Sequence, residues 1–148
     1  MAQFVFLVHH ADAVPPDVDH TRPLSSIGVA QAERVAHGAL ERGAKPSLVW
    51  HSGKLRARQT AEICTRVLNP FAPINAVRGL QPDDNPETIV NALAAEPSDV
   101  LIAGHMPFLP ALLQRLTAAT GSVQFPPNGC VALERLGDTW EERWRVAP

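Results

Sequence analysis

Apolar residues follow two different spacings along the chain. Short, continuous apolar runs predict buried strands, whereas apolar residues that recur every three or four positions predict helices with one buried face. The expected strands cover residues 3–8, 48–50, 75–77 and 100–103. The expected helices begin at Ser25, Ser52, Asn85 and Pro107, and three of them should end at Gly43, Asn69-Pro70 and Thr120-Gly121.

Strands that alternate with helices predict a three-layer α/β fold, a mostly parallel sheet with helices on both faces. Residues 130–136 and 139–146 flank Gly137-Asp138 and predict a C-terminal antiparallel hairpin at the edge of that sheet. Trp140 and Trp144 are four residues apart on the second hairpin strand, so we expect both rings on one face. The length of 148 residues predicts one domain, residues 1–148.

The charge balance narrows the range of partners. The chain has 13 Lys and Arg against 15 Asp and Glu, a formal net charge of -2, so nucleic-acid binding is not expected.

Cys64 and Cys130 form neither a disulfide framework nor a CxxC pair and are expected to be buried apolar residues. Residues 4–8 are too short for a signal-peptide core, and no apolar run approaches the ~20 residues of a membrane span. We therefore expect a cytoplasmic protein without a membrane partner.

Reactive side chains follow three of the expected parallel strands. His9 and His10 follow the first strand, and His105 follows the fourth. Past the second strand lie His51, Ser52 and Lys54, with Arg56 at the start of the next helix. Ligands of such sheets bind beyond the carboxyl ends of the strands, where helix N-termini add partial positive charge and free N–H donors. Imidazole and guanidinium groups at this edge, without a pair of carboxylates, indicate a site for phosphate or another compact anion.

Four segments, in this order, resemble the histidine phosphatase superfamily. Residues 6–11 (FLVHHA) resemble its Arg-His-Gly motif, and residues 21–28 (TRPLSSIG) resemble the RPLT..G segment of its short bacterial members. Residues 52–61 (SGKLRARQTA) are similar to its SP..RA.QTA block, and residues 102–107 (IAGHMP) are similar to its GH.P element. The chain also has the length of the short SixA-type phosphohistidine phosphatases. The resemblance implies a phosphoglycerate mutase-like fold.

The resemblance also assigns roles to four residues. His10 corresponds to the nucleophile that becomes phosphorylated, Arg22 and Arg56 to a clamp on the phosphoryl oxygens, and His105 to a donor to those oxygens. These roles imply a metal-independent phosphatase, without a cofactor, that acts on phosphohistidine, another phosphoprotein or a small phosphate ester. The chemistry agrees, because a neutral imidazole is a competent nucleophile at about pH 7 and guanidinium matches phosphate geometry.

Two residues depart from the Arg-His-Gly motif. His9 replaces the arginine, and Ala11 replaces the glycine. A bound phosphate dianion is expected to favour protonated His9, which would then supply part of the missing charge. The methyl group of Ala11 is expected where the backbone approaches the ligand. Lys54 and Arg58 are further candidates to compensate for the lost charge.

These departures leave other functions open. One is a catalytically weak or inactive pseudo-phosphatase that binds phosphate or a phosphoprotein, with His9 as a phosphate donor or a non-functional replacement. Another is a metal-dependent hydrolase that uses His9, His10, Asp12 and His105. The sequence does not favour the metal-dependent hydrolase, because adjacent histidines on a strand should point apart and no HxH or HExxH spacing occurs.

A general acid for the leaving group is the least defined part of the expected site. Asp83 and Asp84 stand at a possible position, whereas Asp12 has the character of a turn residue. Short members of the family that act on phosphohistidine often lack a clear acid, because the phosphoramidate bond is labile.

Alternative roles also exist for the two arginines: Arg56 could form an ion pair with Glu62 or Asp83, and Arg22 could anchor its loop.

Overall fold

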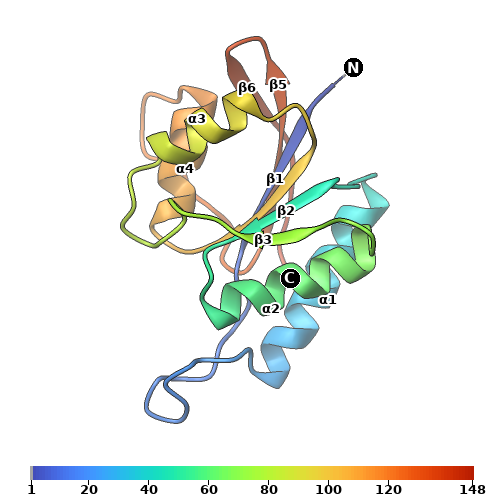
Figure 1. Ribbon diagram of the computed structural model, residues 1–148, viewed down its shortest axis with the longest axis vertical. Coiled ribbons are helices and arrows are strands. Elements are labelled where there is room, and N and C mark those ends of the chain that lie inside the picture. Colours follow the sequence, from blue (N-terminus) through green and yellow to red (C-terminus); the bar gives the residue numbers. More distant parts are fainter. Residues whose placement is uncertain (1) are drawn as a thin grey trace.

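A central sheet with helices on both faces organises the structure, a computed structural model that describes residues 2–148 (Figure 1). In chain order the elements are β1 (Phe4–His9), α1 (Ser26–Glu41), β2 (Leu48–His51), α2 (Leu55–Leu68), β3 (Ile74–Ala76), α3 (Glu87–Ala95), β4 (Val100–Gly104), α4 (Phe108–Thr117), β5 (Cys130–Leu136) and β6 (Thr139–Val146). Every element that the apolar spacing predicts is present. Between residues 2 and 148, no helix combines the length and apolar character needed to cross a membrane.

The sheet has the strand order β3-β2-β4-β1-β5-β6. Strands β1 to β4 pair in parallel, whereas β5 pairs antiparallel to β1 and β6 antiparallel to β5. The expected mostly parallel sheet with an antiparallel hairpin at its edge is therefore confirmed. The pairing places Val5 opposite Val100, so segments far apart in the sequence lie side by side. The carboxyl ends of β1, β2 and β4 consequently meet at one edge of the sheet.

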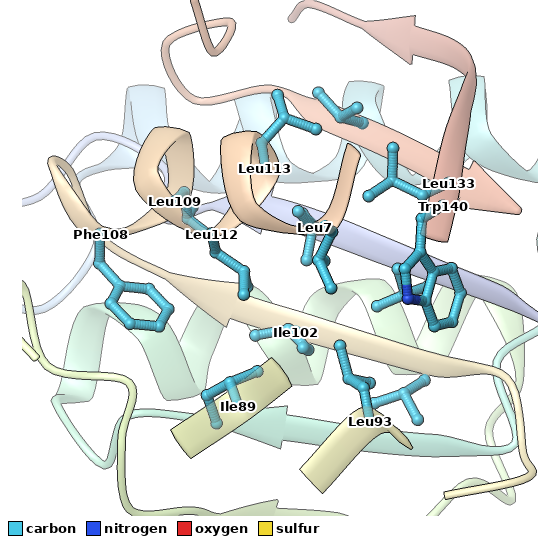
Figure 2. Close-up of a cluster of buried hydrophobic side chains, with 14 of the residues drawn as sticks. Leu7, Ile89, Leu93, Ile102, Phe108, Leu109, Leu112, Leu113, Leu133 and Trp140 are labelled. Carbon is cyan, nitrogen blue, oxygen red and sulfur yellow. The ribbon is translucent and has the colours of Figure 1, made fainter. Parts of the chain in front are cut away.

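Alternate residues of the strands enter two separate cores. On one face, Leu7 of β1 and Ile102 of β4 pack against α3 and α4, with Leu133 and Trp140 from the hairpin beside them (Figure 2). On the other face, Phe6 and its neighbours pack against α1 and α2. Truncating a buried leucine typically costs about 2–5 kcal/mol, so these two layers hold the strands that carry the candidate site.

The two cysteines are part of the second core. Cys64 and Cys130 are each 1% exposed and belong to the same apolar cluster. Burial raises the pKa of Cys64 to about 12 and the pKa of Cys130 well above its ordinary value. Both thiols therefore stay protonated and pack as small apolar side chains, as the sequence predicts.

Two helices begin as their sequences predict. The hydroxyl of Ser25 accepts the backbone N–H of Gly28 at 3.0 Å and caps α1. Asn85 accepts the backbone N–H of Glu87 at 3.0 Å, and Pro86 between them already has helical backbone angles, with φ -59° and ψ -22°. Because α3 begins at Glu87, Pro86 is its cap residue and lies one position before the expected first helical position; its missing N–H is not needed there either.

The prediction that Trp140 and Trp144 share one face is wrong. Trp140 lies in the core beneath α3 and α4, whereas Trp144 packs against the core on the opposite face. The register between β5 and β6 shifts at Ala132/Leu133, which leaves one extra residue, Arg143, on β6. Such a β-bulge reverses the face to which the following side chains point.

Candidate active site

Strands β1 and β4 bring three histidine rings to one edge of the sheet. His9 is the last residue of β1, His10 follows it, and His105 follows β4. The backbone N–H of His10 donates to the Gly104 carbonyl at 3.0 Å, which ties the two strand ends together. Ring centroids are 5.1 Å apart for His10 and His105, and 4.6 Å apart for His9 and His10. The structure thus gathers three residues that the sequence singles out.

Hydrogen bonding determines which nitrogen of His10 carries the proton. Its Nδ1 lies 2.8 Å from the carbonyl oxygen of Ala11. A carbonyl oxygen only accepts, so Nδ1 is the protonated nitrogen and Nε2 of the neutral ring keeps its lone pair. Burial lowers the pKa of His10 from its ordinary 6.5; the bond to Ala11 opposes this shift, and Arg56 and Arg22 reinforce it. At about pH 7 the ring is therefore neutral, and Nε2 is its nucleophilic atom.

His9 has its proton on the other nitrogen. The backbone N–H of Asn128 donates to His9 Nδ1 at 2.8 Å, so the proton of the neutral ring must be on Nε2. Burial, and after it the neighbouring His10, lower the pKa of His9 to about 4. His9 is therefore not the expected cation, because protonation of its Nδ1 would break the hydrogen bond from the Asn128 N–H. His9 instead offers one neutral N–H donor.

The rings of His9 and His10 do not point apart as expected. They meet edge to face, with an interplanar angle of 62°. The expectation rests on strand alternation, but β1 ends at His9, and His10 no longer follows the alternating pattern.

The hydroxyl of Ser52 contacts the ring of His105 and does not cap a helix as expected. Ser52 is expected to cap α2, but the cap position is Lys54, and Ser52 Oγ lies 2.6 Å from His105 Nε2. Ser52 Oγ also accepts the backbone N–H of Lys54 at 3.3 Å, so its own proton is available to His105 Nε2. In this arrangement Nδ1 carries the ring proton, and it is buried without a hydrogen-bond partner among the described residues. Burial, then His10 and Arg56, lower the pKa of His105 to about 3.

Cationic side chains surround these neutral rings. The Nε of Arg56 is buried and has no hydrogen-bond partner in the part of the chain that the structure describes. Burial, and then the nearby Arg22, lower the pKa of Arg56. Lys54 is close enough to contribute to the lowered pKa of His105. A buried polar atom without a partner is rare in folded proteins, so these donors indicate a binding site for an anion.

The ion pair considered for Arg56 belongs to its neighbour on the helix. Arg58 Nε lies 3.9 Å from the carboxylate of Glu62, and about half of each side chain is exposed. Arg58 also contributes to the lowered pKa of the buried His51. It therefore lies on a different side of α2 from Arg56 and does not join the cluster.

The loop between β1 and α1 carries Arg22 into the site. Arg22 has a left-handed backbone conformation, with φ 50°, and its Nε donates to the Val14 carbonyl at 3.1 Å. Gln59 of α2 fixes the same loop by accepting the backbone N–H of Leu24 at 2.7 Å. Arg22 thus anchors its loop through Nε, while its charge acts on the pKa of His10.

Ala11 packs inward. The expectation that its methyl group lies where a ligand approaches is wrong, because Ala11 is 1% exposed and clusters with Ala32 and Ile63 between α1 and α2. Its backbone N–H donates to Thr60 Oγ1 at 3.1 Å, and Thr60 donates to the Arg56 carbonyl at 2.8 Å. This chain of bonds links the segment after His10 to the helix that carries Arg56.

A cavity of about 710 Å³ lies at the carboxyl ends of β2 and β3 and is linked to the histidine cluster through Ser52, which contacts His105. Ser52 and Asp84 both line it. Gln81 donates to the Ser52 carbonyl at 2.8 Å, and Asp84 accepts the backbone N–H of Gln81 at 2.9 Å, so the loop is tied to the end of β2. Asp83 is exposed. Of the two candidate acids, Asp84 is the one that faces a cavity beside the site.

The groups proposed as metal ligands have other partners. The carboxylate of Asp12 accepts the hydroxyl of Ser25 at 2.6 Å, and Nδ1 of His9 accepts a backbone N–H. Within residues 2–148, no three His, Cys, Asp or Glu side chains are arranged so that they could hold a metal ion.

Asn128 is a site residue that sequence reasoning missed. Ser52 lies past the end of β2, as the strand-end rule predicts, but its contact with His105 was not expected. Asn128 precedes β5 by two residues, in the turn-forming sequence PPNG, and only the pairing of β5 with β1 places it against His9.

No protein-family model matches the chain, and no curated protein matches it. Solved structures do match. The protein histidine phosphatase SixA complexed with tungstate has a TM-score of 0.87 and 23% identity, over 98% of this chain and 97% of that one. A SixA protein from Agrobacterium tumefaciens has a TM-score of 0.80 and 29% identity, over 99% and 98%. A mycobacterial glucosyl-3-phosphoglycerate phosphatase complexed with VO3 has a TM-score of 0.73 and 14% identity, over 99% and 100%.

These matches extend over nearly the whole length of both partners while the sequences differ at most positions. The structure therefore agrees with the α/β architecture that the apolar spacing predicts and with the phosphoglycerate mutase-like fold that the resemblance implies. The chain has the fold of the histidine phosphatase superfamily, and SixA phosphohistidine phosphatases are among its structural neighbours.

Proposed function

We propose that this chain is a phosphatase that works through a phosphohistidine intermediate on His10 and needs no metal ion. The observation that carries the proposal is the neutral His10, with Nε2 unprotonated, 5.1 Å from His105 and within the field of Arg22 and Arg56. Tungstate and VO3, which two of the structural neighbours bind, are oxyanions that mimic a phosphoryl group, and they support the same site chemistry here.

In the first step, Nε2 of His10 attacks the phosphorus atom. A P–N bond forms as the bond from phosphorus to the leaving group breaks, and the leaving group departs with the bonding electron pair and takes up a proton from solvent. Arg22, Arg56 and the Nδ1–H of His105 would stabilise the charge on the phosphoryl oxygens. The Ala11 carbonyl accepts the Nδ1–H of His10 and so stabilises the positive charge that the ring acquires.

In the second step, water attacks the phosphorus atom of phosphorylated His10. The P–N bond breaks, its electron pair returns to Nε2, inorganic phosphate leaves, and the proton of the attacking water passes to phosphate or solvent. The same cationic groups serve both steps, because the charge on the phosphoryl oxygens is similar in each.

We infer that the substrate is a phosphohistidine protein of the cytoplasm. An imidazole leaving group needs less acid assistance than an alkoxide, which suits a site whose nearest candidate acid, Asp84, already accepts a backbone N–H. The cavity of about 710 Å³ beside Ser52 is large enough for the side chain that carries the phosphoryl group. Another phosphoprotein or a small phosphate ester is the next candidate.

A binding function without turnover is the second candidate, and the neutral state of His9 favours it. The family motif has a permanent cation at this position, whereas His9 offers one uncharged donor. Losing one well-placed phosphoryl donor typically costs about 10²–10³ in rate. In this reading the site recognises phosphate or a phosphoprotein without hydrolysing it.

One assay tests both readings. Purified protein is given an aryl phosphate and a phosphohistidine protein, with and without EDTA, from about pH 5 to 8. We expect turnover that survives EDTA and disappears in His10→Ala, with a radiolabelled phosphoryl group trapped on the wild-type protein after acid-free quenching. His37→Ala, which removes an exposed histidine of α1, is the matched control and should retain full activity.

Two results would contradict the proposal. Orthovanadate binding without turnover at any pH supports the pseudo-phosphatase. Loss of activity on chelation, with recovery on adding a divalent metal, supports a metal-dependent hydrolase.

A further inference from the structure

Residues 126–129 form a tight turn that leads into β5 and lies against the end of β1. The Gly129 N–H donates to the Pro126 carbonyl at 2.9 Å, and Asn128 has a left-handed backbone conformation with φ 57°. Proline restricts the backbone of a turn, and asparagine tolerates a positive φ, so the sequence PPNG suits this conformation. A Cβ atom on Gly129 would lie 2.5 Å from the Val146 carbonyl oxygen, which leaves room only for glycine.

The turn binds the two adjacent histidines at three points. The Gly129 carbonyl accepts the backbone N–H of His9 at 3.0 Å. The backbone N–H of Asn128 donates to Nδ1 of the His9 ring at 2.8 Å. The side-chain Nδ2 of Asn128 donates to the His10 carbonyl at 2.9 Å. One asparagine therefore contacts the ring of His9 through its backbone and the backbone of His10 through its side chain.

The backbone group opposite each Nδ1 explains why the two neighbouring rings hold their protons on different nitrogens. Nδ1 of His9 faces a backbone N–H, whereas Nδ1 of His10 faces a backbone carbonyl. A donor opposite Nδ1 requires the Nε2–H tautomer, and an acceptor requires the Nδ1–H tautomer. Backbone contacts therefore leave a proton on Nε2 of His9, which can donate a hydrogen bond. They leave a lone pair on Nε2 of His10, which can act as a nucleophile.

We propose that Asn128 is a positioning residue for the proposed phosphatase reaction. Its backbone fixes His9 as an uncharged Nε2–H donor, and its side chain holds the His10 backbone so that the ring keeps its bond to the Ala11 carbonyl. The inference rests on the proposed function, because it assigns Asn128 a role in placing the nucleophile.

The groups around the two rings indicate that the turn at residues 126–129 selects the tautomer of His9. Arg56, Arg22 and Asp12 act on His10, with opposite signs for the arginines and the aspartate. For His9, the main influences are burial and the adjacent His10. The Asn128 N–H is therefore the contact that selects the tautomer of His9, while charged side chains act chiefly on His10.

The tautomers can be measured directly on the full chain. Histidine-selective ¹⁵N labelling and long-range ¹H–¹⁵N correlation spectra would be recorded from about pH 5 to 8, with His9→Gln and His10→Gln used to assign the rings. We expect His9 to show a protonated Nε2 and an unprotonated Nδ1 throughout, and neutral His10 to show the reverse. A His9 ring with its proton on Nδ1, or one that titrates with an ordinary pKa, would overturn the proposal.

Two variants separate the side chain from the backbone of Asn128. Asn128→Gly keeps the positive φ and the N–H to His9 but loses the bond to the His10 carbonyl, and we expect kcat to fall roughly tenfold to hundredfold with KM little changed. Asn128→Asp keeps the shape but adds a negative charge, which raises the pKa of His10 and moves the acid limb of the pH–rate profile to higher pH. Asn75→Gly, at an exposed position of β3, is the matched control and should behave as wild type.

Failure of this inference can be told apart from failure of the proposed function. Wild-type kcat in both variants at residue 128, with unchanged circular dichroism, would reject the positioning role while the phosphatase stands. If the wild type binds orthovanadate but hydrolyses no substrate, the proposed phosphatase activity is rejected. The positioning role is then tested by the affinity of Asn128→Gly for orthovanadate. An affinity equal to that of the wild type would then reject the positioning role as well.

Discussion

At the scale of single residues, the largest departure from the family motif is the exchange of a permanent cation for His9. The exchange alters more than charge, because His9 Nδ1 accepts the Asn128 N–H, a bond that an arginine side chain cannot form. Arginine is a donor only, so it would serve the phosphoryl group and leave the turn without its acceptor. Activity and stability should therefore respond to this position in opposite directions.

We predict that His9→Arg raises kcat/KM for an aryl phosphate by roughly tenfold, because a charged donor is added to the site. The same change should lower the free energy of unfolding by about 1 kcal/mol, because the Asn128 N–H loses its acceptor. Steady-state kinetics and urea denaturation at about pH 7 measure the two effects. His9→Gln is the control: it keeps an acceptor without a charge and should not raise the rate. An unchanged or lower rate in His9→Arg would show that the site is built around histidine.

Residue types at strand ends were predictable, but their partners were not. The positions of His10 and His105 follow from the rule that parallel strands present their ligands beyond their carboxyl ends. The contact of Ser52 with His105 depends on the side-chain direction at the end of β2, and a serine before a helix more often caps it. Ala11 shows the same limit, since its burial between α1 and α2 depends on how closely those helices approach.

At the scale of secondary-structure elements, the approach of α1 to the segment after β1 sets the position of the Arg22 loop. Gly28, in the first turn of α1, lies so close to this segment that a Cβ atom would be 2.0 Å from the Asp12 carbonyl oxygen. That oxygen also accepts the backbone N–H of Ser25 at 3.0 Å, so the contact is part of the start of the helix. The glycine in the TRPLSSIG segment is therefore required by packing.

We predict that Gly28→Ala lowers the free energy of unfolding by about 1–3 kcal/mol, because a rigid backbone atom blocks the new methyl group. This sign is opposite to the usual helix preference for alanine over glycine, which is about 1 kcal/mol. Gly38→Ala in the same helix is the matched control: its Cβ would lie 2.7 Å from a methyl carbon of Val146, a side chain that can shift more easily than a backbone oxygen. Urea denaturation should show a change below about 1 kcal/mol in the control. Equal stability of the two variants would contradict the close approach.

Element types and order followed from apolar spacing, because the residues that define each period are the residues buried in the two cores. The bulge between β5 and β6 could not be predicted from that spacing. Period two predicts one face for Trp140 and Trp144, but the extra residue Arg143 is visible only once the two strands are paired. The hairpin could be read from local sequence, and its register could not.

At the scale of the whole molecule, folding collects ionisable rings that prefer to be neutral. His9, His10 and His105 all have lowered pKa values, to about 4 for His9 and about 3 for His105, with burial as the main cause. In the unfolded chain these rings return to an ordinary pKa of about 6.5. As the pH falls below about 6.5, the unfolded chain therefore binds protons that the folded chain does not, and stability decreases.

We predict that the free energy of unfolding is greatest above about pH 6.5 and falls steadily as the pH is lowered towards 4. Urea denaturation at several pH values measures the slope. His105→Gln removes the ring with the lowest pKa and should reduce that slope, whatever its stability at neutral pH. His37→Gln makes the same exchange at an exposed position and is the matched control. A slope that is the same in wild type and His105→Gln would show that the buried ring does not govern acid sensitivity.

The pairing of Val5 with Val100, and of β1 with β5, also bears on the order of events during synthesis and folding. A nascent chain that has emerged only to residue 100 contains His10 but has neither the complete β4 partner of its strand nor the turn at residues 126–129. Closing so long a loop is entropically costly, which makes contacts of this kind slow to form. The candidate site should therefore be assembled late, as one of the last parts of the structure that the growing polypeptide completes.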